Sequence, residues 1–217
     1  MSSNTLAHLL NPSNPSDDAI VIPDGPTISY SQYADEIERV AGILAGAGVM
    51  PGKPVSIILP NSLEFMILFL AVAQAGAVAA PLNSEYTIEE FKFFMHDANS
   101  QLAIVPEGAH KGRDAANELG ITVIDASLDN GSLVLLENGK TLTNSSDPQP
   151  PSEEDVALFL HTSGTTSRPK GVPLTHANLM KSIDNIKTHY ELTPEDTSII
   201  VMPLFHVHGL MLSLIHI

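Results

Sequence analysis

Apolar and polar positions follow two different patterns along the first 124 residues. Short continuous apolar runs bounded by proline or glycine, such as 55–59, are typical of strands buried on both faces of a sheet. Between these runs, apolar residues recur at helical spacing, which predicts amphipathic helices. The expected strands are 19–22, 27–29, 55–59, 78–81, 102–105 and 121–124, and the expected helices are 31–47, 61–75, 87–95 and 113–119. This alternation predicts an α/β fold with mostly parallel sheets flanked by helices.

Helix starts are marked by side chains that cap free backbone N–H groups. Asn61 with Glu64, and Thr87 with Glu90, have the spacing of a capping box and are expected to open the second and third helices. Thr175 is expected to cap a later helix over 176–190. The most apolar of these helices has only about nine uninterrupted apolar residues, too few to span a bilayer, which needs about 20. We therefore expect a buried core helix and no membrane span.

The regular alternation breaks between residues 125 and 155, where Asn-Gly pairs and a Ser/Asn/Pro-rich run occur. Residues 133–136 are expected to form an edge strand in this stretch. The boundary predicted from it separates a first α/β subdomain, 1–150, from an incomplete second one, 151–217. The second unit is expected to contain a strand from Val156, a hydroxyl-rich loop, the 176–190 helix and a strand at 198–202.

The hydroxyl-rich loop follows an apolar run and reads HTSGTTSRPKGV from residue 161 to residue 172. Residues 162–166 supply five backbone N–H groups and four hydroxyls, and Lys170 and Arg168 supply positive charge. That combination suits a polyphosphate, although an ordinary solvated loop has the same composition. The P-loop of common NTPases is excluded, because Lys170 is followed by Gly171 instead of by a serine or threonine that opens a helix.

Two histidines lie in the segment PLFHVHGL, residues 203–210. On a strand, His206 and His208 would share one face, as a metal site requires, but no third ligand accompanies them at a suitable spacing. We expect no metal site. A single imidazole at the carboxyl end of a strand is better suited to contact a carboxylate or phosphate, because the ligand crevice of open α/β sheets lies there.

The formal net charge of −15 disfavours nucleic acid and anionic membranes as partners, because the ten lysines and arginines are scattered and form no basic patch. Cysteine is absent, which excludes disulfides, thiolate metal sites and a cysteine nucleophile. Nothing in the sequence predicts an oligomeric state.

Three segments together resemble a known family. HTSGTTSRPKGV resembles the phosphate-loop motif of the adenylate-forming enzymes, the acyl-CoA synthetase and luciferase superfamily. PLFHVHGL resembles the histidine-bearing block that follows it about forty residues later, and LPNSLEFMILFLAVAQAGAVAAPLN, residues 59–83, resembles the first subdomain. The form with Ser167-Arg168 and LTHANL resembles the branch that contains oxalyl-CoA synthetase and peroxisomal CoA synthetases.

The resemblance implies a set of site residues. His206 matches the family histidine near the substrate carboxylate and the α-phosphate, and His208 would at most line the pocket. Ser167 stands where glycine is commoner, which restricts the backbone of the loop. The residues that match the loop holding the β- and γ-phosphates of ATP are Thr162, Ser163, Gly164, Thr165, Thr166, Ser167 and Lys170.

The implied activity is that of an AMP-forming acid–thiol ligase. A small carboxylic acid would react with ATP to give an acyl-adenylate, with Mg²⁺ present, and CoA would then displace AMP. The expected location is cytoplasmic or peroxisomal. The alternative is a non-catalytic nucleotide-binding or interaction module made from the same fold.

The resemblance also implies a family length of roughly twice these 217 residues, so we expect a truncated N-terminal domain that does not form acyl-adenylate at a useful rate. The last six residues, 212–217, read LSLIHI, where the family usually continues into a helix rich in small residues. One reading frame of the mosaic end used in transposase-based sequencing libraries encodes LSLIHI. We therefore expect 212–217 to be library sequence and His216 to have no functional role.

Overall fold

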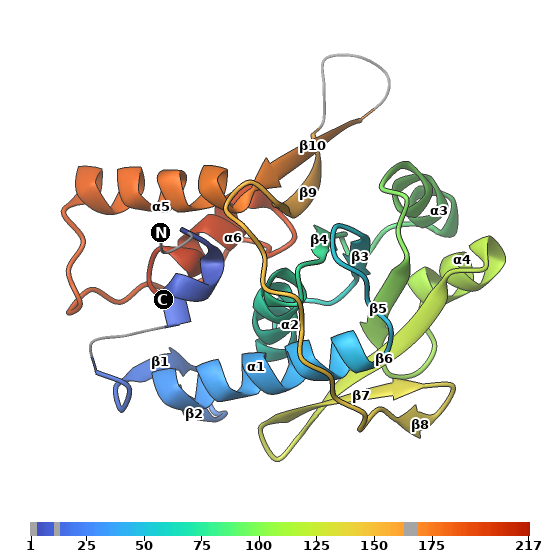
Figure 1. Cartoon of the computed structure of the whole chain (residues 1–217), viewed down its shortest axis with the longest axis horizontal. Coiled ribbons are helices and arrows are strands. Elements are labelled where there is room, and N and C mark those ends of the chain that lie inside the picture. Colours follow the sequence, from blue (N-terminus) through green and yellow to red (C-terminus); the bar gives the residue numbers. More distant parts are fainter. Residues whose placement is uncertain (1–3, 11–13, 163–168) are drawn as a thin grey trace.

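A computed structural model describes residues 4–10, 14–162 and 169–217, and its centre is an eight-stranded sheet (Figure 1). A second, two-stranded antiparallel sheet lies near the N-terminus and consists of β1 (Asp18–Val21) and β2 (Thr27–Ser29). In order across the large sheet the strands are β10 (Lys170–Thr175), β9 (Val156–Thr162), β4 (Val78–Pro81), β3 (Pro54–Ile57), β5 (Leu102–Pro106), β6 (Thr122–Asp129), β7 (Ser132–Glu137) and β8 (Lys140–Thr141).

The five central strands, from β9 to β6, are all parallel, and β10, β7 and β8 extend the sheet in antiparallel pairs. The predicted α/β class with a mostly parallel sheet is therefore confirmed. One strand assignment is corrected. Residues 133–136 lie in β7, which pairs with β6 on one side and β8 on the other, so the edge is the short β8. The Asn138-Gly139 turn connects β7 to β8. Both residues adopt positive φ, which a tight two-residue hairpin turn requires.

Helices cover both faces of the sheet. They are α1 (Tyr30–Gly46), α2 (Leu63–Gln74), α3 (Ile88–Asp97), α4 (Lys111–Leu119), α5 (His176–Tyr190) and α6 (Val207–Leu214), and a 3₁₀ helix η1 (Leu6–Leu10) precedes them. In β5, Leu102 and Ile104 belong to the apolar cluster of α1 and α2, whereas Ala103 and Val105 belong to that of α3 and α4. Right-handed crossovers produce this division, because α2 connects β3 to β4 in one direction while α3 and α4 lead back the other way.

Two of the three predicted helix caps are confirmed. Thr87 and Glu90 form a full capping box at α3, and Thr175 caps α5 with Asn178 as its partner. The prediction for Asn61 is wrong. Ser62 is the residue that caps α2, by accepting a hydrogen bond from the N–H of Phe65 at 3.3 Å. Capping by the next residue leaves the Asn61 side chain available for another part of the chain.

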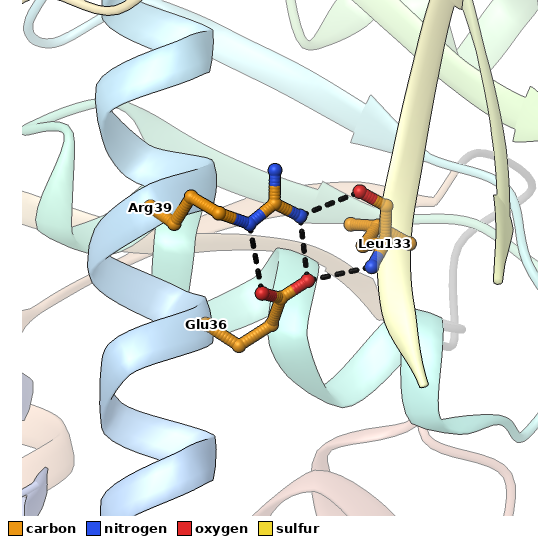
Figure 2. A network of polar contacts seen from close by, with 3 residues as sticks. All are labelled: Glu36, Arg39 and Leu133. Atoms are coloured by element: carbon orange, nitrogen blue, oxygen red, sulfur yellow. Dashed lines mark hydrogen bonds and ion pairs between the residues drawn. The ribbon is translucent and has the colours of Figure 1, made fainter. Parts of the chain in front are cut away.

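A polar network joins α1 to the antiparallel end of the sheet (Figure 2). Arg39 donates two hydrogen bonds to the Glu36 carboxylate, at 2.6 and 2.8 Å, and one to the carbonyl oxygen of Leu133 at 2.6 Å. The N–H of Leu133 donates to Glu36 at 2.6 Å. Partial burial raises the pKa of Glu36, but the bonds from Arg39 and Leu133 outweigh it, so the pKa lies below its ordinary value. Glu36 is thus held as a carboxylate.

The chain from 151 onward does not form a separate sheet, because β9 pairs with β4 and β10 pairs with β9. The subdomain boundary at 150 stays a prediction. The strand predicted at 198–202 is wrong, since this segment has no regular secondary structure and pairs with none of the described strands. Ile199 and Val201 are 82% and 76% exposed. β-Branched residues favour a strand only where a neighbouring strand accepts their backbone hydrogen bonds, and none of the described strands does so here. Among the described residues, no helix is long and apolar enough to span a bilayer.

Candidate functional site

The hydroxyl-rich loop is held by the β9–β10 hairpin, which projects from the body of the molecule in Figure 1. Thr162, the last residue of β9, pairs with Lys170, the first residue of β10, and both side chains are exposed. Two of the predicted loop residues are thereby brought face to face at the mouth of the hairpin. The predicted residues Ser163, Gly164, Thr165, Thr166 and Ser167 lie outside the described part of the chain.

Below its mouth, the hairpin is held by an aromatic cluster and one polar contact. His161 lies 4.7 Å from the ring of Phe94 in α3 and 5.2 Å from that of Phe159, measured between ring centroids. Its Nε2 is 2.9 Å from the carboxylate of Asp97, the last residue of α3. Gly171 lies within β10 opposite His161. The Phe159 ring packs against Gly171, since a Cβ at this position would lie 2.3 Å from that ring and would force it to move.

These contacts are needed because β9 has little support from the parallel sheet. Its described pairing with β4 is limited to Leu158 opposite Ala79. From Phe159 onward, the partner of β9 is β10 alone, which is itself an edge strand. The position of the hairpin mouth, Thr162 and Lys170, relative to the core therefore depends on α3 as well as on the sheet.

His206 does not lie on a strand, so the expectation that it shares a strand face with His208 is wrong. His206 is the N-cap of α6, and its Nδ1 accepts a 3.4 Å hydrogen bond from the N–H of His208. This arrangement places the proton of a neutral imidazole on Nε2, and the His206 side chain is exposed. Within the described residues, no group of three histidine, aspartate or glutamate side chains is arranged to hold a metal ion.

Sequence reasoning missed the residue that positions the His206 segment. The Asn61 side chain donates from Nδ2 to the carbonyl oxygen of Met202 at 2.9 Å, and its Oδ1 accepts from the N–H of Leu204 at 2.7 Å. Asn61 was assigned to helix capping because it comes three residues before Glu64. The sequence signal against this assignment was Ser62, one position later, because serine caps a helix as well as asparagine does.

The topology brings the two predicted motifs to one edge of the sheet. Strands β3 and β9 are the two parallel neighbours of β4, so their carboxyl ends lie at the same edge. Thr162 ends β9, and Asn61, which holds the His206 segment, lies in the turn after β3. This is the edge at which open α/β sheets bind ligands.

Charge at this edge favours an anion. Lys170 forms no ion pair with any acidic residue of the described ranges, and a hydroxyl faces it across the hairpin. A free ammonium group beside hydroxyl and backbone donors fits a phosphate group. Described acidic side chains do not gather into a set that could hold Mg²⁺. The residues present therefore fit the phosphates of ATP but not a resident magnesium ion.

One histidine outside this edge is buried and structural. His176, at the start of α5, is 1% exposed, and its Nδ1 accepts a hydrogen bond from the N–H of Leu6 at 3.2 Å. Its Nε2 has no hydrogen-bond partner among the described residues. Burial lowers the pKa of His176 to about 4, although the Asp155 carboxylate acts in the opposite direction. His176 is therefore neutral at pH 7 and ties the N-terminal segment to α5.

Comparisons with known proteins show the family to which the chain belongs. The family model described as AMP-binding enzyme matches residues 11–217. The oxalate–CoA ligase of Arabidopsis thaliana is 44% identical over 223 residues, which cover 99% of this chain and 43% of that protein. The oxalate–CoA ligase of Saccharomyces cerevisiae is 37% identical, with 89% of this chain and 41% of that protein covered.

Solved structures give the same result for the fold. ATP-bound MatB from Rhodopseudomonas palustris superposes with a TM-score of 0.83 at 28% sequence identity, over 99% of this chain and 43% of that one. The chain thus spans less than half the length of these three relatives. Its fold is that of the N-terminal part of an adenylate-forming enzyme, and the chain belongs to the AMP-binding enzyme family.

Proposed function

We propose that this chain is the N-terminal part of a ligase that activates a small carboxylic acid with ATP and transfers the acyl group to CoA. The observation that carries the proposal is the pairing of Thr162 with Lys170 at the mouth of the β9–β10 hairpin, where a lysine without an acidic partner among the described residues closes a hydroxyl-rich segment. The sequence identity of 44% and 43% with two proteins named as CoA ligases, over 99% and 91% of this chain, supports the same assignment.

In the proposed reaction, a carboxylate oxygen attacks the α-phosphorus of ATP, the bond from that phosphorus to the bridging oxygen breaks, and pyrophosphate leaves. Lys170 and Thr162 bind the β- and γ-phosphates and offset the charge that builds up on the leaving group. His206 donates from Nε2 to the carboxylate or the α-phosphate and orients the two reactants. The thiol of CoA then displaces AMP and forms the thioester.

The substrate we propose is oxalate, since the relatives with 44% and 37% identity are named oxalate–CoA ligases. Other relatives carry the names feruloyl-CoA synthase and crotonobetaine/carnitine–CoA ligase. The test uses the longer polypeptide encoded by the uninterrupted reading frame and measures pyrophosphate exchange with oxalate, ferulate or crotonobetaine. Exchange that depends on oxalate supports the proposal, and exchange with none of the three acids contradicts it. A cytoplasmic or peroxisomal location belongs to the same proposal.

For the 217 residues alone, we propose binding of polyphosphate without formation of acyl-adenylate. Calorimetry with inorganic tripolyphosphate tests the binding, and a net charge of −15 makes nonspecific association with this anion unfavourable. Lys170→Ala should weaken binding about tenfold or more, as loss of a charge-assisted hydrogen bond predicts. Lys140→Ala is the matched control, because Lys140 is also an exposed lysine that opens the second strand of a hairpin. Equal effects of both changes would contradict a specific site.

The second candidate is a non-catalytic nucleotide-binding module. The observation that favours it is the exposure of His206 at the start of α6, with none of its described side-chain hydrogen bonds reaching beyond its own turn. Oxalate-dependent pyrophosphate exchange by the longer polypeptide would contradict this candidate, whereas nucleotide binding by that polypeptide without exchange with any of the three acids would support it.

A further inference from the structure

We infer that Asn61 is a positioning residue for His206. Its side chain forms two hydrogen bonds to the backbone of a segment more than 140 residues away, to Met202 at 2.9 Å and to Leu204 at 2.7 Å. This pair of bonds is called the Asn61 bridge below. An asparagine amide satisfies both bonds at once because it has a donor and an acceptor on one planar group.

The segment on the far side of the bridge is irregular on its N-terminal side. Residues 198–202 form no strand, and Ile199 and Val201 are largely exposed, although Ile200 packs against the main apolar core. The Asn61 bridge adds two polar contacts between the end of this segment and the body of the protein. Leu204, whose N–H the bridge holds, is 2% exposed and packs into the main apolar core.

From Leu204, the position of the backbone is carried to His206 by a compact turn. The N–H of His206 donates to the carbonyl oxygen of Pro203 at 3.0 Å. Gly209, one turn later, packs directly on the same turn, since a Cβ at this position would lie 2.3 Å from the Pro203 oxygen. Close contact of this kind leaves residues 202–209 little freedom to move as separate parts, so a shift at Met202 or Leu204 is transmitted to the imidazole.

The other end of the bridge is equally fixed. Asn61 lies between β3, whose last residue Ile57 is fully buried, and the capping residue Ser62 at the start of α2. Because β3 and β9 flank β4, the turn that carries Asn61 belongs to the same sheet edge as the hairpin mouth. Asn61 thus sets the place of His206 relative to Thr162 and Lys170 without itself reaching a reacting group.

Hydrogen exchange of the 217-residue chain tests the bridge independently of any activity. In Asn61→Ala, the Leu204 amide should exchange about tenfold faster, as loss of one hydrogen bond predicts, and the ring signals of His206 should shift. Amides of α2 and β3 should keep their protection. Asn83→Ala is the matched control, since Asn83 also follows a parallel strand, but the hydrogen bond of its side chain within the described residues comes from the N–H of Glu85, two residues away.

A second variant separates the two bonds. Asn61→Asp is nearly isosteric and keeps an acceptor for the Leu204 N–H, but it places a carboxylate oxygen against the Met202 carbonyl. We expect Leu204 to retain most of its protection while the His206 ring signals still shift. Unchanged Leu204 exchange and unchanged His206 signals in Asn61→Ala would overturn the inference, as would a loss of protection spread evenly over the core.

The catalytic part of the inference rests on the proposed function and is measured in the longer polypeptide. Asn61→Ala should lower kcat for oxalate-dependent pyrophosphate exchange about 10- to 100-fold, with the KM for ATP changed less than about twofold, because a misplaced reacting group costs rate more than binding. Asn83→Ala should leave both values unchanged. A wild-type kcat in Asn61→Ala would overturn the positioning role. If the wild-type polypeptide has no activity, the proposed function is wrong, and the exchange data still decide whether Asn61 positions His206.

Discussion

Two segments of similar apolar composition, β5 and residues 198–202, differ sharply in their exposure to solvent. Every residue of β5 from Leu102 to Val105 is at most 3% exposed, because helices cover both faces of the sheet there. Ile199 and Val201, in a segment of comparable apolarity, are 82% and 76% exposed. The difference is the presence of neighbouring strands and covering helices, since apolar sequence alone does not supply a partner.

The contrast extends to how each region is held in place. In the region from 54 to 129, many apolar contacts together hold each strand in place, so no single hydrogen bond determines the position of a strand. In the region from 156 to 210, residues such as Leu179 and Leu204 also pack into the core, but individual polar contacts add to the positioning of the candidate site. These contacts are His161 with Asp97, the Asn61 bridge, and His176 with Leu6. All the candidate ligand-binding residues lie in this second region. Local changes there should therefore alter function more than stability.

The largest effect should come from the doubly covered core. Phe69 of α2 is 1% exposed, and Phe69→Ala should lower the free energy of unfolding by about 3–5 kcal/mol, because it removes buried apolar area and leaves a cavity. Ile199→Ala should change it by less than about 0.5 kcal/mol. Urea unfolding followed by circular dichroism measures both. Similar losses for the two variants would show that 198–202 is buried in solution, which would contradict the difference in exposure between this segment and the core.

A smaller effect is expected from the pH dependence of His176. Its pKa of about 4 in the folded protein lies below the ordinary value of 6.5, so the unfolded chain takes up the proton first as the pH falls. The contribution to stability is complete above about pH 6.5 and declines toward pH 4. Between pH 7 and pH 5, the wild type should lose roughly 1–2 kcal/mol more than His176→Asn, which keeps an acceptor for the N–H of Leu6.

The exposed His189, on the same helix, is the control for this measurement. His189→Asn should follow the wild-type dependence on pH. If His176→Asn followed it too, His176 would not be the group that titrates, and the N-terminal segment would be held by other contacts.

The next effect tests whether a polar network matters where apolar packing is dense. Glu36→Gln removes the charge that Arg39 and the Leu133 N–H bind, and should lower the free energy of unfolding by about 1–2 kcal/mol. Glu38→Gln, on the exposed side of α1, is the control and should have almost no effect. Because the pKa of Glu36 is depressed, the difference between the two variants should vanish once the pH falls below that pKa. A difference that persists at low pH would mean that the carboxylate is not its source.

The smallest effect on stability should accompany a clear local effect. Asp97 is 43% exposed, so Asp97→Ala should lower the free energy of unfolding by less than about 1 kcal/mol. The amides of His161 and Thr162 should nevertheless exchange faster, because the hairpin loses its polar contact to α3. Asp184→Ala, at an exposed position of α5, should leave that exchange unchanged. Unaltered exchange in Asp97→Ala would mean that the aromatic cluster alone holds the hairpin.

Local signals made the core of the fold predictable. The capping box of Thr87 and Glu90 and the cap at Thr175 define helix starts within a few residues of sequence, and both were found as expected. Buried apolar runs such as 55–59 also mark strands, since their hydrophobicity reflects cover on both faces. What failed depended on distant parts of the chain. The strand at 198–202 lacked a partner, and Asn61 bonds with residues more than 140 positions away.

The candidate site was predictable by residue type but not by geometry. The composition of 162–170 indicated phosphate binding, yet the antiparallel pairing of Thr162 with Lys170 depends on how two strands meet. His206 was predicted at the carboxyl end of a strand, but it caps α6, and that place required the three-dimensional turn at Pro203 and Gly209. The role of each of these residues in binding stays a proposal.

The borders of the sheet have a consequence for how the protein behaves at high concentration. One border is β8, only two residues long and opened by Lys140, and the other is β10, which contains Pro173 and so lacks one backbone donor. Both features hinder another molecule from adding a strand. Residues 198–202, uncharged and rich in β-branched side chains, have no such protection. Self-association of the isolated chain should therefore start at this segment, and a lysine at position 199 or 201 should suppress it.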